Sequence, residues 1–132
     1  MSESQHSLKV SSGIIALLEQ HAERAAPEEC VGFLFGRGDK VFRHVPLTNV
    51  AEAPERRFFA EPTEMLRALM AADKTEETLL AVYHTHPQGP DRLSEDDIQH
   101  AQPSLVQLLL TPEGVSAFLV VDGLVKEVRL ES

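Results

Sequence analysis

Two histidines stand one residue apart just before a turn in the segment 83–97, which reads YHTHPQGPDRLSEDD. Side chains two residues apart on a strand point to the same side, so His84 and His86 direct two imidazoles toward one point. Imidazole nitrogen and carboxylate oxygen are both zinc ligands, and a catalytic zinc site combines three protein ligands with water in the fourth position. The segment therefore predicts two ligands of an open metal site that needs a third.

The acids that follow the turn are the candidates for the third ligand. Pro-Gln-Gly-Pro at 87–90 reverses the chain, and Ser94 then opens a short helix as its N-cap, with acids at 95–97 in the first turn. Asp97 is the preferred candidate, because a helix of 3.6 residues per turn brings it near the face of Ser94. The competing interpretation is an ordinary N-cap whose acids match the helix dipole, beside two surface histidines.

A metal-activated water also needs a group that accepts its proton, and a nearby carboxylate can do this. Glu28 and Glu29 stand directly before the apolar stretch CVGFLFG, an unusual place for solvated acids. Either of them is a candidate base that points into a cleft, and the alternative is a pair of solvated acids after a helix end. Cys30 beside them could be a nucleophile, but its apolar surroundings favour a buried, inert thiol.

These candidate residues lie at the ends of predicted strands and helices. Apolar residues at helical spacing predict helices at 11–26, 61–73 and 94–102, the first of them capped by Ser11 or Ser12. Short apolar runs between turn signals predict strands at 30–36, 41–47, 78–84, 105–111, 115–121 and 124–130. The order α-β-β-α-β-α-β-β-β predicts a mixed sheet covered by helices.

The composition is that of one globular domain, residues 1–132, with 42% apolar and 25% charged residues. We expect residues 1–7 and the segment NVAEAPERR at 49–57 to be flexible. No segment approaches the run of about 18 apolar residues that a membrane span needs, and the polar N-terminus lacks the apolar centre of a secretory signal. Together with a single cysteine, this predicts a cytoplasmic protein without a membrane partner.

The charge balance excludes one further class of partner. The chain has 21 acids against 12 basic residues, which gives a formal net charge of -9. This charge repels phosphate backbones, so we expect no nucleic acid partner.

At the level of motifs the chain resembles a known family. EECVGFLFG, followed some fifty residues later by HTHPQGPDRLSEDD, is similar to the signature of the JAMM, or MPN+ (JAB1/MPN/Mov34), metalloproteases. That signature reads Glu-x-x-Gly, then His-x-His, seven residues, Ser, two residues and Asp, and every position is filled here. The spacing to Gly32 selects Glu29 over Glu28. The segments NVA, FFAEPTEM and AVYHTHP also resemble bacterial stand-alone members, so the resemblance covers roughly residues 11–129.

The resemblance implies a fold and a set of roles. The fold would be the α/β MPN (cytidine-deaminase-like) fold, a curved mixed β-sheet flanked by helices in a single domain. One zinc ion per chain would be held by His84, His86 and Asp97. Glu29 would be the general base and then the acid, and Ser94 would hydrogen-bond the oxyanion of the tetrahedral intermediate.

The resemblance also implies an activity. The chain would be a zinc metallopeptidase, an isopeptidase similar to deubiquitinases, that hydrolyses the isopeptide or peptide bond after the C-terminal glycine of a ubiquitin-like or sulfur-carrier protein of the ThiS/MoaD type. The alternative is a catalytically silent MPN scaffold that acts through protein–protein interaction. Leu93 stands where many bacterial relatives have proline, and the long insertions of eukaryotic deubiquitinases are absent from the sequence.

Several points stay open at the level of sequence. The carrier is not identified, and the leaving amine is a lysine, a cysteine or a peptide. The oligomeric state is undetermined, a homodimer included. His100, three residues after Asp97, is either near the metal or on the surface, and Arg56 and Arg57 either contact substrate or are solvated.

Overall fold

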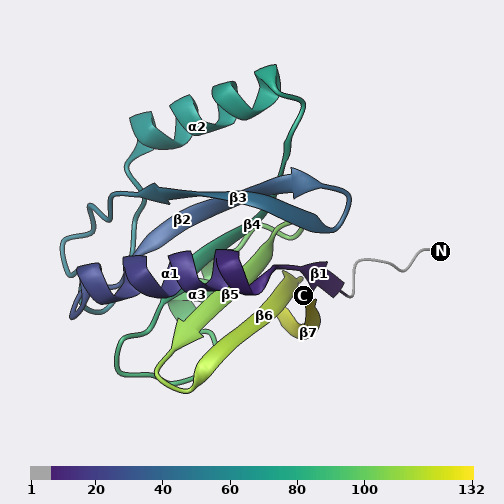
Figure 1. Ribbon diagram of the computed structural model, residues 1–132. Coiled ribbons are helices and arrows are strands. Elements are labelled where there is room, and N and C mark those ends of the chain that lie inside the picture. The colour runs from purple at the N-terminus through teal and green to yellow at the C-terminus, as the bar shows by residue number, and fades with distance from the viewer. Residues whose placement is uncertain (1–6) are drawn as a thin grey trace.

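Seven strands and three helices make up residues 7–132, the part of the chain that the computed structural model describes (Figure 1). They are β1 Ser7–Lys9, α1 Ser12–Ala25, β2 Val31–Arg37, β3 Lys40–Leu47, α2 Pro62–Lys74, β4 Thr78–Thr85, α3 Glu95–His100, β5 Val106–Thr111, β6 Gly114–Val121 and β7 Leu124–Glu131. The predicted order is confirmed, with β1 added at the start. None of the helices in the described part is long and apolar enough to cross a membrane.

The strands form one sheet in the order β1-β3-β2-β4-β5-β6-β7 that closes on itself as a barrel. The pairs β2–β3, β2–β4, β5–β6 and β6–β7 are antiparallel, while β4–β5 and both pairings of β1 are parallel. The curved mixed sheet with flanking helices predicted from the sequence is therefore confirmed. The closure was missed, because β1 has only three residues and no apolar alternation.

Strand β1 bears on the prediction that residues 1–7 are flexible. Ser7 begins β1 and pairs with Arg129 of β7, and Lys9 pairs with Lys40 of β3. Residues 1–6 of that segment lie outside the described residues.

The helices cover different parts of the sheet, and β2 and β3 lie between α1 and α2 (Figure 1). Leu18 of α1 is fully buried in the cluster that contains Tyr83 and Leu108. On the other side, α2 packs Ala68 and Ala72 in a second cluster. Burying a side chain such as Leu18 stabilises the fold by about 1.5–3 kcal/mol, so these apolar faces fix where each helix lies.

Local signals in the sequence place the element ends. Ser11 is the N-cap of α1 and its side chain accepts the Ile14 N–H, which decides between the two predicted caps. Pro62 occupies the first turn of α2, where its missing N–H costs nothing. Asp122 and Gly123 have φ of 53° and 77°, the left-handed pair that a tight hairpin between β6 and β7 requires.

Gly32, the glycine of the Glu-x-x-Gly motif, has a packing role. It pairs with Tyr83 across β2 and β4, and a Cβ at Gly32 would overlap the Tyr83 ring and hydroxyl. The Tyr83 hydroxyl in turn lies 2.8 Å from Nδ1 of His21 on α1. The glycine thus admits the tyrosine that connects α1 to β4, one residue before His84.

We expect Gly32→Ala to lower the free energy of unfolding by about 1–3 kcal/mol, since the added methyl group must displace the Tyr83 ring. Urea unfolding followed by far-UV circular dichroism measures this. The control is Gly13→Ala in α1, where the nearest atom to the new Cβ is 3.8 Å away and the helix should be equally or more stable. A Gly32→Ala protein as stable as the wild type would contradict the packing role.

Candidate metal centre

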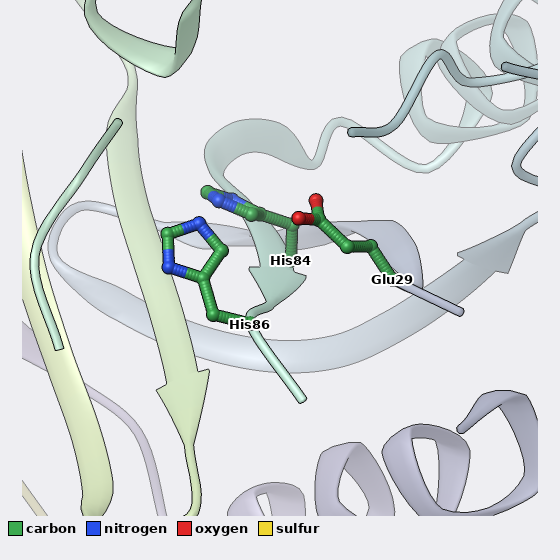
Figure 2. Close-up of side chains that lie close together, drawn as sticks. All are labelled: Glu29, His84 and His86. Carbon is green, nitrogen blue, oxygen red and sulfur yellow. The ribbon is translucent and has the colours of Figure 1, made fainter. Parts of the chain in front are cut away.

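Pairing between β2 and β4 brings three site residues together. Val31 pairs with His84, and the Thr85 N–H donates to the Cys30 carbonyl at 3.2 Å, so Glu29 and His86 lie where the paired strands end. One ligand atom from each of Glu29, His84 and His86 lies within 4.8 Å of the others, and Figure 2 shows the three side chains gathered at one point. All three are buried.

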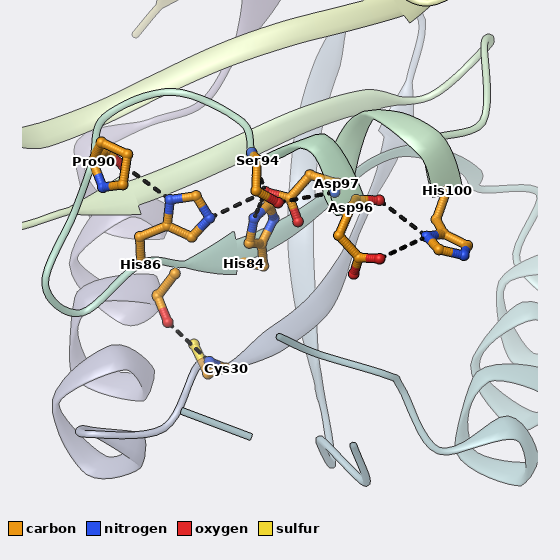
Figure 3. Close-up of polar contacts among 9 residues, drawn as sticks. Cys30, His84, His86, Pro90, Ser94, Asp96, Asp97 and His100 are labelled. Atoms are coloured by element: carbon orange, nitrogen blue, oxygen red, sulfur yellow. Dashed lines mark hydrogen bonds and ion pairs between the residues drawn. The ribbon is translucent and has the colours of Figure 1, made fainter. Parts of the chain in front are cut away.

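The cap of α3 brings Asp97 to the same point. The Ser94 Oγ accepts the Asp97 N–H at 3.0 Å, and the Asp97 Oδ2 accepts the Ser94 N–H at 2.9 Å. The same Oδ2 lies 3.2 Å from Nε2 of His84 and 3.1 Å from Nε2 of His86 (Figure 3). A reciprocal capping box therefore holds the Asp97 carboxylate against both imidazoles.

The proton on His86 can be placed from its partners. Its Nδ1 lies 2.9 Å from the carbonyl oxygen of Pro90, which only accepts, so Nδ1 carries a proton. Burial lowers the pKa of His86, but its contacts with Asp97 and Pro90 outweigh burial and raise it. In the neutral ring the Nε2 lone pair faces the Asp97 carboxylate, and that arrangement is stable only with a positive charge between them.

The pKa shifts of Asp97 and His84 favour the ionised carboxylate and the neutral imidazole. Burial raises the pKa of Asp97, but hydrogen bonds from both histidines hold it well below its usual range. Burial lowers the pKa of His84, which favours the neutral ring. A neutral imidazole and an ionised carboxylate are the forms that bind a metal.

Glu29 is 5% exposed, and its Oε1 has no hydrogen-bond partner in the described part of the chain. Burial raises its pKa to about 7, with His86 opposing and the charges of Asp97 and Asp96 adding to the rise. A buried carboxyl oxygen without a partner costs free energy unless a cation or water satisfies it. The unexposed position of Glu29, in contrast to exposed Glu28, agrees with the choice of Glu29 from the motif.

The donor set fits a zinc-type cation. Two imidazole nitrogens and one carboxylate oxygen make three ligands, which leaves one tetrahedral position open for a reactant. Ligands at the usual zinc distances lie about 3.4 Å apart in a tetrahedron, and the Asp97 Oδ2 already lies 3.1 and 3.2 Å from the two nitrogens. Asp97 therefore suits the third ligand better than Glu29, which remains beside the site.

His84 differs from an ordinary metal-binding histidine in how its ring is oriented. Such histidines usually donate the second ring N–H to a carboxylate or carbonyl, but the buried Nδ1 of His84 has no partner among the described residues. The Phe58 ring lies on His84 instead, with centroids 4.5 Å apart and planes tilted by 34°. At Nδ1, packing rather than a hydrogen bond therefore orients this imidazole, whose Nε2 contacts Asp97.

The remaining candidate residues lie outside this cluster or in a supporting position. The Ser94 Oγ accepts the Asp97 N–H, which leaves its own hydroxyl proton free to be donated. Burial raises the pKa of Cys30 to about 11, so the thiol is inert at neutral pH. His100 is exposed and contacts Asp96 through Nδ1. Arg56 and Arg57 are exposed on the loop before Phe58.

Two residues near the site were missed by the sequence reasoning. Phe58 stacks on His84, and Asn49 donates to the Glu29 carbonyl at 2.9 Å. Both lie in the loop between β3 and α2. Asn49 begins the segment 49–57 that was predicted to be flexible, and Phe58 directly follows it. The NVA segment was noted as a likeness to relatives, but nothing in it indicated a contact with Glu29.

Two cavities reach the cluster from different sides. One of about 350 Å³ is lined by His86 and Thr85, by α1 and by the turn between β5 and β6. The other, of about 340 Å³, is lined by Glu29, by α1 and by residues 46–49 at the end of β3. A substrate can therefore approach both His86 and Glu29.

The fold and the cluster define a class of protein, and comparison with known sequences gives the family. The chain belongs to the Prok-JAB family, the prokaryotic homologs of the JAB domain, whose sequence model matches residues 11–130. It is 38% identical over 116 residues to the "Probable TtuB-protein conjugate cleaving protease" of Thermus thermophilus, covering 88% of this chain and 78% of the relative. It is 26% identical over 128 residues to the "CysO-cysteine peptidase" of Mycobacterium tuberculosis, covering 91% and 87%.

Solved structures agree with the fold. The solution structure of protein DSY2949 from Desulfitobacterium hafniense superposes with a TM-score of 0.83 at 30% identity, covering 95% of this chain and 94% of that one. AF2198, a JAB1/MPN domain protein from Archaeoglobus fulgidus, superposes with a TM-score of 0.64 at 17% identity, covering 96% and 99%. The resemblance drawn from the motif is thus confirmed for both family and fold.

We expect Asp97→Asn to weaken zinc binding by at least about 10–100-fold, because the charge that two imidazoles share is removed while an amide oxygen can still cap α3. Competition with a chromogenic chelator measures the affinity of the metal-free protein. Asp96→Asn is the matched control, since it makes the same change one residue away on an exposed side chain and should bind zinc as the wild type does. Equal affinities for the two variants would exclude Asp97 as a ligand.

Proposed function

We propose that this protein is a zinc-dependent metallopeptidase of the cytoplasm that hydrolyses the isopeptide or peptide bond after the C-terminal glycine of a ubiquitin-like or sulfur-carrier protein. The observation that carries the proposal is the convergence of His84, His86 and Asp97 beside a buried, unpartnered Glu29 carboxyl. The names of the relatives, a conjugate-cleaving protease and a CysO-cysteine peptidase, support the kind of bond and the kind of substrate.

The ligands would be His84, His86 and Asp97, with one zinc ion per chain. Bound zinc supplies Lewis-acid chemistry: it favours loss of a proton from water and polarises the scissile carbonyl. The capping box and the Pro90 carbonyl hold two of the ligands before the metal arrives, so little rearrangement is needed on binding.

Glu29 acts as general base and then as general acid. Its carboxylate accepts the proton of the attacking water while the water oxygen bonds to the carbonyl carbon. The same group then gives this proton to the departing nitrogen as the carbon–nitrogen bond breaks. Burial suits Glu29 to both steps, because a pKa raised toward neutrality makes the group able to take and return a proton.

Ser94 stabilises the negative charge that develops on the carbonyl oxygen of the substrate. Its Oγ already accepts the Asp97 N–H, which fixes the side chain and leaves the hydroxyl proton directed elsewhere. In the reaction the hydroxyl donates a hydrogen bond to the carbonyl oxygen as negative charge develops there, and the proton stays on Ser94.

The edge of β3 offers a place for an extended substrate tail. β3 pairs with β2 along its length, but with β1 only at Lys40, so its other edge is free near Leu47 within residues 7–132. The cavity at 46–49 continues from this edge to Glu29. A glycine-ended tail would add here as a strand and place its last carbonyl at the site.

We expect Glu29→Gln to lower kcat by about 10²–10⁴-fold while zinc stays bound, since the amide cannot accept a proton and is not a ligand. The measurement is cleavage of a carrier protein ending in Gly-Gly that is fused to a reporter peptide, with zinc content determined for each protein. Glu28→Gln is the matched control at an exposed position and should cut within a few-fold of wild type. A zinc-loaded wild type that cuts neither ubiquitin-like nor sulfur-carrier fusions would favour the silent scaffold.

A second test concerns the substrate tail. Replacing the last glycine of the carrier by leucine should lower kcat/KM by at least about tenfold, because the added side chain must fit between the β3 edge and α1. A leucine placed well before the glycine tail serves as the control. Unchanged cleavage of the leucine-ended carrier would argue against binding of an extended tail in this cavity.

A further inference from the structure

Asn49 organises the loop that connects β3 to α2. Its Oδ1 accepts the N–H groups of Ala51 and Phe59, both at 3.0 Å. Its Nδ2 donates to the carbonyls of Glu29 at 2.9 Å and Arg57 at 3.1 Å. An asparagine side chain offers two N–H donors and one acceptor oxygen, and all of this capacity is used.

One of these bonds forms half of a clamp on the main chain of Glu29. The Glu29 N–H donates to the Pro54 carbonyl at 2.7 Å, and the Glu29 carbonyl accepts from Asn49 Nδ2. Asn49 Nδ2 also lies 3.4 Å from the Pro54 carbonyl, so the two halves of the clamp are joined. Since one carboxyl oxygen of Glu29 has no partner of its own, this clamp on the main chain fixes the point from which the carboxyl projects into the site.

The other bonds fix Phe58 from both sides. Asn49 holds the carbonyl of the residue before it, Arg57, and the N–H of the residue after it, Phe59. Phe58 in turn stacks on His84, whose Nδ1 has no hydrogen-bond partner to orient the ring. Stacking against Phe58 therefore orients this imidazole in place of a hydrogen bond at Nδ1.

We propose that Asn49 is a positioning residue that sets the geometry of two groups at once, the Glu29 carboxyl through its backbone and the His84 imidazole through Phe58. Asn49 contacts neither the ligand nitrogens nor the reacting atoms. The kinetic part of this inference rests on the proposed peptidase function, whereas the structural and metal-binding parts do not.

Two substitutions separate the roles of the amide. Asn49→Ala removes every bond of the side chain. Asn49→Asp keeps an acceptor for Ala51 and Phe59, but it has no N–H for Glu29 or Arg57 and places a negative charge against their carbonyls. The control is Val128→Ala in β7, a buried residue of the first core cluster, whereas Phe58 packs against the second.

The first readout is hydrogen exchange in the metal-free proteins, followed by NMR. In Asn49→Ala, the Glu29 and Phe59 amides should exchange at least about tenfold faster than in Val128→Ala. In Asn49→Asp, the Phe59 amide should keep its protection because its acceptor oxygen remains. The Glu29 amide should be less protected, because the new carboxylate repels the Glu29 and Pro54 carbonyls of the clamp. The Asp variant also decides the question should the Ala variant fail to fold.

The second readout is zinc affinity, and the third is kinetics on the Gly-Gly carrier fusion. Both Asn49 variants should bind zinc about tenfold more weakly and show kcat lowered by about 10–100-fold, because misplaced groups reduce the rate. KM should be nearly unchanged, since Asn49 lines the substrate cavity but its amide is fully bonded within the protein. Val128→Ala should match the wild type in both at a temperature where all proteins are folded.

The outcomes separate this inference from the proposed function. Zinc affinity and kcat equal to the Val128→Ala control would overturn positioning and leave only a structural role. A rise in KM alone would overturn it in favour of substrate binding. A wild type that cuts no carrier refutes the proposed function, while exchange and zinc affinity still decide whether Asn49 positions Glu29 and His84.

Discussion

The arrangement of the site depends on a single carboxylate oxygen, Asp97 Oδ2, which lies 3.2 Å from the His84 Nε2 and 3.1 Å from the His86 Nε2. Two ring nitrogens and a carboxylate oxygen this close together are stable only with a proton or a metal cation among them, because their lone pairs would otherwise repel. The sheet end, the loop at 87–90 and the cap of α3 all converge on this point. The group of residues is therefore suited to hold a metal ion, and such binding would also stabilise the fold by linkage.

Three kinds of contact hold the surrounding side chains, and each is of a different physical type. Strand pairing sets Glu29 and His86 opposite each other, and a helix cap sets Asp97. Packing against Phe58 orients the His84 ring, and the Gly32–Tyr83 contact fixes the strand position just before it. These contacts come from separate elements, and Asn49 connects two of them through its bonds to the Glu29 carbonyl and to the main chain on both sides of Phe58.

Burial raises the pKa of both acids of the site, but their different hydrogen-bond partners give them opposite net shifts. Asp97 has both imidazoles as partners and a pKa well below its usual range, while Glu29 lacks a partner for one oxygen and has a pKa raised to about 7. Two carboxyls with pKa values moved apart are suited to different tasks, one to binding a cation and the other to moving a proton. Membership of the Prok-JAB family is consistent with this division.

Six of the seven strands, the three helices and the motif residues could be predicted from the sequence, since strand alternation, helical spacing and caps depend on neighbours in the chain. His84, His86, Ser94 and Asp97 lie within one short segment, so turn and cap chemistry alone indicated their convergence. The closure of the sheet into a barrel by β1 and the contacts of Asn49 and Phe58 became visible only in the folded structure. Those contacts join residues far apart in the chain, such as Asn49 to Glu29 and Phe58 to His84, and no local pattern of residue types records which distant groups a loop will meet.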